Sequence, residues 1–187
     1  MLKRELRVLG IDDTPFDKHR DKTATLIGIV YRGGSFPDGL LSATVRVDGT
    51  DGTAVIARMV NQSKFKEQLR AILLKGIAVA GFNLIDIRAL SRRTRLPAIV
   101  VMRHIPKSDE MASALNKLGL SSQAAILNRV PKIHRAGKLL FQCAGCSQQH
   151  AAEVIALTTT HGNLPEPLRV AHLIASGITL GESRGKA

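Results

Sequence analysis

Three strand-like segments follow one another before the first helical pattern in this sequence. Residues 6–11 form a short apolar run that ends at Asp12 and Asp13, residues 23–32 are rich in β-branched side chains, and residues 40–47 alternate apolar and polar side chains. Each segment is followed by Asp, Gly or Pro, which favour turns. Sequential strands joined by turns are typical of an antiparallel meander, so we expect the fold to be organised around a sheet.

Helical and strand-like segments alternate in the rest of the chain, and the spacing of their apolar residues distinguishes the two kinds. The expected helices are residues 53–61, 63–70, 84–93, 108–118, 147–158 and 166–176, and the expected strands are residues 71–74, 98–102 and, at an edge, 139–142. A meander followed by alternating helices and strands implies a mixed sheet. The predicted fold class is therefore α/β, with three antiparallel strands, then parallel strands, and helices on both faces.

The length of 187 residues fits one substantial core and is too short for two ordinary domains, so we expect one domain over residues 1–187. The first residues lead into an apolar run that is broken at Asp12, and they contain no signal-peptide core. No uncharged apolar stretch reaches the length of a membrane span, about 18 residues. Two cysteines suit a reducing compartment. These features predict a cytoplasmic protein with no membrane partner, and they leave the oligomeric state open.

The formal net charge is +12, from 27 Lys and Arg residues against 15 Asp and Glu residues. So large an excess predicts a polyanionic partner, DNA or RNA, that is bound through its phosphates. Aromatic residues make up only 3% of the chain, which argues against a stacking platform for single strands. The candidate nucleic-acid-binding residues come from two basic segments and are Lys18, Arg20, Lys22, Arg92, Arg93 and Arg95.

Acidic residues follow several of the predicted strands. Asp12 and Asp13 end the first strand, Asp48 and Asp51 follow the third, and Asp86 lies early in a predicted helix. Carboxylates that meet at strand ends build oxygen-ligand sites for Mg²⁺, or for Mn²⁺. We expect Asp12, Asp13 and Asp51 to be metal ligands and Asp12, Asp51 and Asp86 to be catalytic. In the structural alternative, Asp13 begins a turn, Asp51 caps a helix and Asp86 complements a helix dipole.

Cys143 and Cys146 form a single Cys-x-x-Cys pair, with His134 and His150 nearby. A closed structural zinc site needs four ligands and usually contains two such pairs. The second cysteine precedes Ser147, a residue type that favours the start of a helix. Two ordinary half-buried cysteines are therefore the preferred interpretation, and a metal or redox pair is the alternative.

Four segments are more particular than strand and helix patterns require. They are Gly10-Ile-Asp-Asp13, Val47-Asp-Gly49, Ala80-Gly-Phe-Asn83 and residues 163–176, which read Asn-Leu-Pro-Glu-Pro-Leu-Arg-Val-Ala-His-Leu-Ile-Ala-Ser. Together they resemble the mostly archaeal domain-of-unknown-function family ninety-nine, over residues 6–184. That family is similar to endonuclease V. The resemblance therefore implies a ribonuclease H-like fold and an activity that uses Mg²⁺ to cut a strand near deaminated purines.

The resemblance is mixed at the positions that carry the endonuclease V chemistry. Asp12 matches the metal-binding Asp of the first strand, and Asp51, or less closely Asp48, is nearest to the Glu expected after the third strand. Lys75 stands at the position of the catalytic Asp, and Cys146 falls at or near that of the catalytic His. The resemblance thus implies that Lys75 pairs with Asp12 in place of a metal ion and that two-metal catalysis lacks ligands.

Two functions remain open. The first is a nucleic-acid-binding protein on an endonuclease V-like scaffold, with the divergent Mg²⁺-dependent nuclease activity of an eroded active site. The second is a non-catalytic module that binds nucleic acid or protein, in which the Asp12–Lys75 pair is a remnant of the metal site. The sequence does not decide whether the protein is an enzyme.

Overall fold

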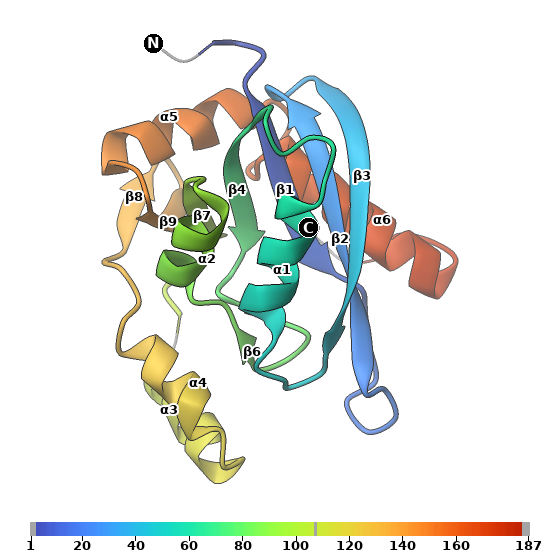
Figure 1. The fold of residues 1–187 in the computed structure, drawn as a ribbon, viewed down its shortest axis with the longest axis vertical. Coiled ribbons are helices and arrows are strands. Elements are labelled where there is room, and N and C mark those ends of the chain that lie inside the picture. Colours follow the sequence, from blue (N-terminus) through green and yellow to red (C-terminus); the bar gives the residue numbers. More distant parts are fainter. Residues whose placement is uncertain (1–2, 107, 185–187) are drawn as a thin grey trace.

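A seven-stranded mixed sheet lies at the centre of the protein in residues 3–106 and 108–184, the residues that this computed structural model describes (Figure 1). Its strands are β1 (Arg7–Asp13), β2 (Thr23–Arg32), β3 (Phe36–Arg46), β4 (Leu69–Lys75), β7 (Ala98–Met102), β8 (His134–Ala136) and β9 (Leu139–Ala144). They lie in the order β3-β2-β1-β4-β7-β9-β8. β2 pairs antiparallel with both β1 and β3, and β4 pairs parallel with both β1 and β7. β9 pairs antiparallel with both β7 and β8. The predicted α/β mixed sheet is confirmed.

Helices cover both faces of the sheet (Figure 1). They are α1 (Gly52–Asn61), α2 (Ile87–Thr94), α3 (Ser108–Lys117), α4 (Ser121–Leu127), α5 (Gln148–Thr158) and α6 (Glu166–Leu180). α1 and α2 pack on one face, α5 and α6 pack on the other, and α3 and α4 form a pair at one end of the molecule. A small ribbon of β5 (Ala78–Val79) and β6 (Asn83–Leu84) connects β4 to α2. Within the described residues, we find no helix with the length and apolar character needed to cross a membrane.

Side chains along each central strand alternate between the two faces and form two apolar cores. In β1, Leu9 and Ile11 lie in the core under α1 and α2, while Val8 lies in the core under α5 and α6. In β4, Leu74 faces the first core and Leu73 faces the second. Burying a side chain of this size contributes about 1.5–3 kcal/mol relative to leaving it exposed. This alternation fixes the face to which the polar residue at the end of each strand points.

Gly10 lets α6 approach β1 closely. A Cβ atom added at Gly10 would lie 2.4 Å from the carbonyl carbon of Pro167, in the first turn of α6. Real Cβ atoms do not come that close to backbone atoms, so any larger residue here would push the helix outward. The first strand and the last helix of the chain therefore lie side by side (Figure 1).

The helix predicted for residues 63–70 does not form. The Lys66 amide donates a hydrogen bond to the Ser63 carbonyl, the Gln68 amide donates to the Phe65 carbonyl, and both bonds close turns. The Ser63 hydroxyl also accepts a hydrogen bond from the Phe65 amide, a local bond that competes with helix formation. Because β4 already begins at Leu69, the remaining segment is too short to nucleate a helix of its own.

Two other boundaries differ from the sequence-based expectations. α2 begins at Ile87 rather than at residue 84, because the Asp86 carboxylate caps it by accepting a hydrogen bond from the Ala89 amide. Asn83, which directly precedes the expected helix start at residue 84, does not cap that helix and accepts a hydrogen bond from the Gly52 amide at the start of α1. β9 is not the edge strand, since β8 pairs along its outer side.

Candidate functional site

Asp12, Lys75 and His172 form a compact cluster at one end of the sheet. The Asp12 Oδ2 atom lies 2.8 Å from the His172 Nδ1 atom and 3.4 Å from the Lys75 Nζ atom. The Lys75 Nζ atom in turn lies 3.1 Å from His172 Nδ1. The Asp12 side chain is only 9% exposed, whereas Lys75 is 30% exposed and His172 is 21% exposed. The cluster therefore combines a buried carboxylate with an amine that solvent can reach.

The alternation of strand side chains explains why these residues meet. Asp12 comes two residues after Gly10, so it points to the face of the sheet that α6 covers. Lys75 comes two residues after Leu73 and points to the same face. β1 and β4 are parallel neighbours, so their carboxyl ends lie at the same end of the sheet. His172 lies on α6 and completes the cluster from above that face.

The His172 ring can use only one of its two short contacts as a hydrogen bond at a time. The Nδ1 atom carries either a proton, which it donates to Asp12, or a lone pair, which accepts a proton from Lys75. The Nε2 atom of the same ring is buried and has no hydrogen-bond partner among the described residues. The polar atoms of Asp12, Lys75 and His172 thus lie within 3.4 Å of one another and offer alternative positions for a proton.

Asp13 points to the opposite face from Asp12, as its place in the strand requires. Its Oδ2 atom accepts a hydrogen bond from the Ala80 amide at 2.9 Å. Burial raises the pKa of Asp13 above its usual value, the Asp12 charge raises it further, and the hydrogen bond from Ala80 opposes both effects. Asp13 thus connects β1 to the turn between β5 and β6 and does not join Asp12, Lys75 and His172.

The other three predicted acids serve the loops and helix starts near α1 and α2. Asp48 accepts a hydrogen bond from the backbone of the β5–β6 turn. Asp51 accepts a hydrogen bond from the side-chain amide of Asn83 at 2.7 Å, and Asp86 caps α2. These contacts match the structural alternative for Asp86, and Asp51 lies at the start of α1 without a side-chain cap bond. The structure does not bring Asp51 or Asp86 to Asp12.

The groups around Asp12 do not fit the Mg²⁺ or Mn²⁺ ion that the family resemblance implies. Mg²⁺ needs several oxygen ligands, at about 2.0–2.1 Å. Here the Asp12 carboxylate faces an ammonium and an imidazole nitrogen. Among the residues that the structure describes, no three His, Cys, Asp or Glu side chains gather to hold a metal ion. Lys75 supplies the positive charge that a cation would otherwise bring to Asp12.

The two basic segments lie at opposite ends of the sheet. We name them the loop cluster, Lys18, Arg20 and Lys22, and the helix cluster, Arg92, Arg93 and Arg95. The loop cluster is exposed in the loop between β1 and β2, and its Lys18 and Lys22 border a hollow that Arg46 also lines. The helix cluster ends α2 and precedes Ala98, which pairs with Ile72 near the start of β4. Only the loop cluster therefore lies at the Asp12 end.

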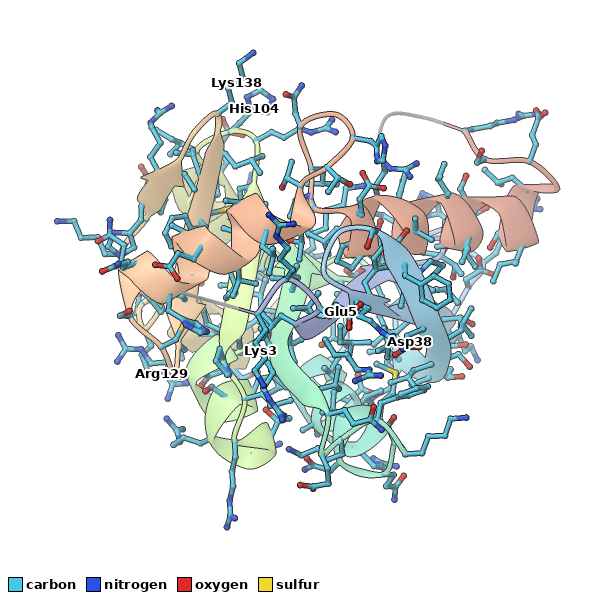
Figure 2. All side chains as sticks on the ribbon, turned by 90° about the horizontal axis from the view of Figure 1, so that it is seen from above. Lys3, Glu5, Asp38, His104, Arg129 and Lys138 are labelled. Carbon is cyan, nitrogen blue, oxygen red and sulfur yellow. The ribbon has the colours of Figure 1, made fainter. Side chains whose placement is uncertain are left out.

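Basic side chains also lie outside both clusters. Lys3, Arg129 and Lys138 occupy three different parts of the molecule in Figure 2. Part of the positive charge is paired within the protein, as at Asp38, where the Arg7 Nε atom lies 2.6 Å from the carboxylate. The Arg7 guanidinium holds the pKa of Asp38 below its usual range. The net charge alone therefore does not locate a binding surface.

Cys146 lies at the other end of the sheet from Asp12. β9 pairs antiparallel with β7, so Cys146, just after β9, lies beside the start of β7, whereas Lys75 ends the parallel neighbour β4. His172 is the imidazole that reaches Asp12. No motif in the sequence assigns a role to His172, although it is the ionisable ring that residues 163–176 place on the apolar face of a helix.

The Cys143 and Cys146 thiols are free and half-buried. Burial raises the pKa of both thiols, and that of Cys146 to about 12. Because only the thiolate reacts, we expect iodoacetamide to modify them at least about tenfold more slowly in the folded protein than in the unfolded protein. Mass spectrometry at mildly alkaline pH measures both rates, and equal rates would contradict this prediction.

Comparison with known sequences finds relatives over nearly the whole chain. The profile of a family described as endonuclease dU matches residues 4–179. A UPF0215 protein of Methanothermobacter thermautotrophicus is 47% identical over 191 residues, which cover 100% of this chain and 94% of the relative. The similarity therefore includes the strands and the helix that carry the Asp12 cluster.

Solved structures share the fold. A protein of unknown function from Archaeoglobus fulgidus superposes with a TM-score of 0.86 at 39% identity, over 92% of this chain and 98% of that one. Endonuclease V of Ciona intestinalis was solved with a 24mer DNA that contains an inosine followed by a ribo-adenosine. It superposes with a TM-score of 0.60 at 15% identity, over 94% of this chain and 86% of that one. The scaffold is therefore endonuclease V-like.

Proposed function

Because the chain belongs to the endonuclease dU family, we propose that it binds nucleic acid at the end of the sheet where Asp12, Lys75 and His172 meet. The loop cluster carries this proposal, since its exposed basic side chains lie in the loop that follows β1, the strand that ends with Asp12 and Asp13. The family is described as endonuclease dU, and dU is the usual abbreviation of deoxyuridine, so DNA that contains deoxyuridine is the ligand we propose first. The DNA bound to the endonuclease V with the same fold supports a nucleic-acid partner.

The physical basis of binding is the release of counterions from phosphates. Each phosphate that a Lys or Arg side chain neutralises adds about 0.7–0.9 to the slope of log K against log salt. The loop cluster presents three such side chains, and Arg46 lines the adjoining hollow. The hollow lies beside the loop that follows β1, the strand that carries Asp12.

Reversing the charge of the loop cluster tests the proposal. The triple variant Lys18→Glu, Arg20→Glu and Lys22→Glu is expected to bind a deoxyuridine-containing duplex at least about tenfold more weakly at low salt. The slope of log K against log salt is expected to fall by about 2–3 units, because three phosphate contacts are lost. Fluorescence anisotropy over a salt series measures both quantities.

The helix cluster provides the matched control. Arg92→Glu, Arg93→Glu and Arg95→Glu together change the net charge by the same amount at the other end of the sheet. This control is expected to weaken binding less than the loop-cluster variant. An equal loss in both variants, or a binding constant of the wild type that does not respond to salt, would contradict the proposed surface. Thermal unfolding of both variants verifies that they fold.

A second candidate function is a divergent nuclease, since Asp12 lies at the buried end of β1 on a scaffold that endonuclease V shares. Lys75 faces Asp12 where a metal ion would bind, so this function requires that Mg²⁺ displace the ammonium group. The test incubates the protein with deoxyuridine-containing, inosine-containing and unmodified DNA and RNA, with and without Mg²⁺ or Mn²⁺. Cleavage that requires the metal and is lost in Asp12→Ala would support this function. Binding without such cleavage would favour the non-catalytic module, whose partner is nucleic acid or protein.

A further inference from the structure

We propose that the Lys75 amine forms an imine with the aldehyde of an abasic deoxyribose in DNA and cuts the strand by elimination. The inference rests on the proposed nucleic-acid binding and deepens it, because it names a substrate class for the Asp12 end of the sheet. Such chemistry uses an amine nucleophile and no metal ion. It therefore suits a cluster in which an ammonium, rather than a divalent cation, faces the carboxylate.

Lys75 is accessible to a large substrate. Its side chain is 30% exposed at the last residue of β4. A Cβ atom added at the next residue, Gly76, would meet no atom within 4 Å, so the space beside this end of the strand is open. The loop cluster lies beyond the neighbouring strand end and offers positive charge to the phosphates that flank an abasic site.

The cluster can take a proton from the Lys75 ammonium group. A lysine attacks an aldehyde only as the free amine. The Lys75 Nζ atom lies 3.1 Å from His172 Nδ1, which accepts the proton on its lone pair. The Asp12 Oδ2 atom, 2.8 Å from the same nitrogen, stabilises the resulting imidazolium. The proton therefore stays within the cluster while the amine reacts.

Imine formation balances within these groups. The Nζ lone pair forms a bond to the aldehyde carbon C1′, and the carbonyl oxygen takes the proton from His172. The nitrogen then loses one of its two protons, the hydroxyl group leaves C1′, and this proton and the hydroxyl group together form water, which leaves a protonated imine. One C=O bond is thus exchanged for one C=N bond, with no oxidant or reductant.

Strand cleavage follows by β-elimination. Asp12, whose Oδ2 atom lies 3.4 Å from Lys75 Nζ, is the base that takes a proton from C2′. The electron pair of the C2′–H bond forms a C2′=C3′ double bond, and the C3′–O bond breaks with its pair on the leaving phosphate. Water hydrolyses the imine, which returns the lysine and releases the unsaturated aldehyde on the upstream strand.

Borohydride trapping tests the proposal with the full chain. The probe is a duplex with one deoxyuridine, from which a uracil-DNA glycosylase has removed the base, incubated in EDTA with sodium borohydride. We expect a covalent protein–DNA adduct joined by a reduced secondary amine, and peptide mapping is expected to place it on Lys75. The same duplex with its uracil still attached is expected to give none.

Two conservative variants sharpen the test. Lys75→Arg keeps a positive charge beside Asp12 but cannot form an imine, so trapping is expected to fall by at least about 100-fold. Lys64→Arg, at an exposed position in the turns that precede β4, is the matched control and is expected to trap at the wild-type level. Thermal unfolding and anisotropy with the abasic duplex are measured for both variants, and peptide mapping on the wild type does not depend on either.

Each outcome decides the proposal. Salt-sensitive binding of the abasic duplex without an adduct overturns the imine chemistry and leaves the proposed binding function in place. An adduct that maps to other lysines, or that persists in Lys75→Arg, also overturns it. A protein that binds none of the DNA probes and forms no adduct overturns both. An EDTA-resistant adduct on Lys75, with a cut strand in the absence of borohydride, supports it.

Discussion

Replacing Lys75 by Asp is expected to raise the affinity of the protein for Mn²⁺ by about 100-fold. The substitution removes the ammonium that faces Asp12 and puts a second carboxylate on the same face of the sheet. Two unit charges about 4 Å apart interact by about 4 kcal/mol at an effective dielectric constant of about 20, which exceeds the roughly 2.7 kcal/mol that a 100-fold change requires. Isothermal titration calorimetry with Mn²⁺ measures the change.

Arg70→Asp is the control for this substitution. Arg70 is exposed at the other end of β4, so the same change of charge occurs far from Asp12. Its Mn²⁺ affinity is expected to stay within about threefold of the wild type. If Lys75→Asp binds Mn²⁺ no better than the control, the two carboxylates do not act on one ion.

Gly10→Ala is expected to destabilise the protein by about 3 kcal/mol. The added Cβ atom would meet the Pro167 carbonyl carbon at 2.4 Å and the Leu168 nitrogen at 2.7 Å. Both are backbone atoms, so α6 must move away from β1, and His172 moves with it. For a chain of this size the unfolding temperature falls by about 2–4 °C per kcal/mol, which amounts to about 6–12 °C. Differential scanning calorimetry measures the shift.

Gly28→Ala separates this close contact from the general effect of replacing glycine in a strand. Gly28 lies in β2 and pairs with Ile11, the residue that follows Gly10 in β1. The atoms nearest to a Cβ atom added at Gly28 all belong to side chains, and the nearest of them is Leu9 Cδ1 at 3.1 Å. Side chains can shift by a few tenths of an ångström, so the expected cost is about 1 kcal/mol or less. If Gly10→Ala and Gly28→Ala reduce the stability equally, the close approach of α6 is not the reason that Gly10 resists substitution.

The sequence predicts most of the sheet because its signals are local. The β-branched run at Thr23–Arg32 and the apolar run at Ala98–Met102 both become strands with the expected bounds. Ser147 caps α5 by accepting a hydrogen bond from the His150 amide. Turn residues, caps and alternation act within a few residues, so a single sequence contains them.

The candidate site was harder to predict because its members come together through tertiary contacts. Asp12 and Asp13 are adjacent in sequence, yet strand geometry sends one to α6 and the other to the β5–β6 turn. Asp51 and Asp86 lie on the side of α1 and α2, where they satisfy local hydrogen bonds. His172 has no sequence neighbour of related chemistry, and only the close approach of α6 at Gly10 explains its contact with Asp12.

The cluster joins two side chains, Asp12 and His172, that are separated by 160 positions along the chain. During synthesis β1 leaves the ribosome long before α6 does, so the three groups cannot assemble until α6 has been made and has docked. A contact of such long range is expected to form late in folding. A nascent chain without α6 would place Lys75 beside Asp12 but would lack the His172 imidazole that accepts the proton of Lys75. The Lys75 amine can therefore react only after α6 has packed on the sheet.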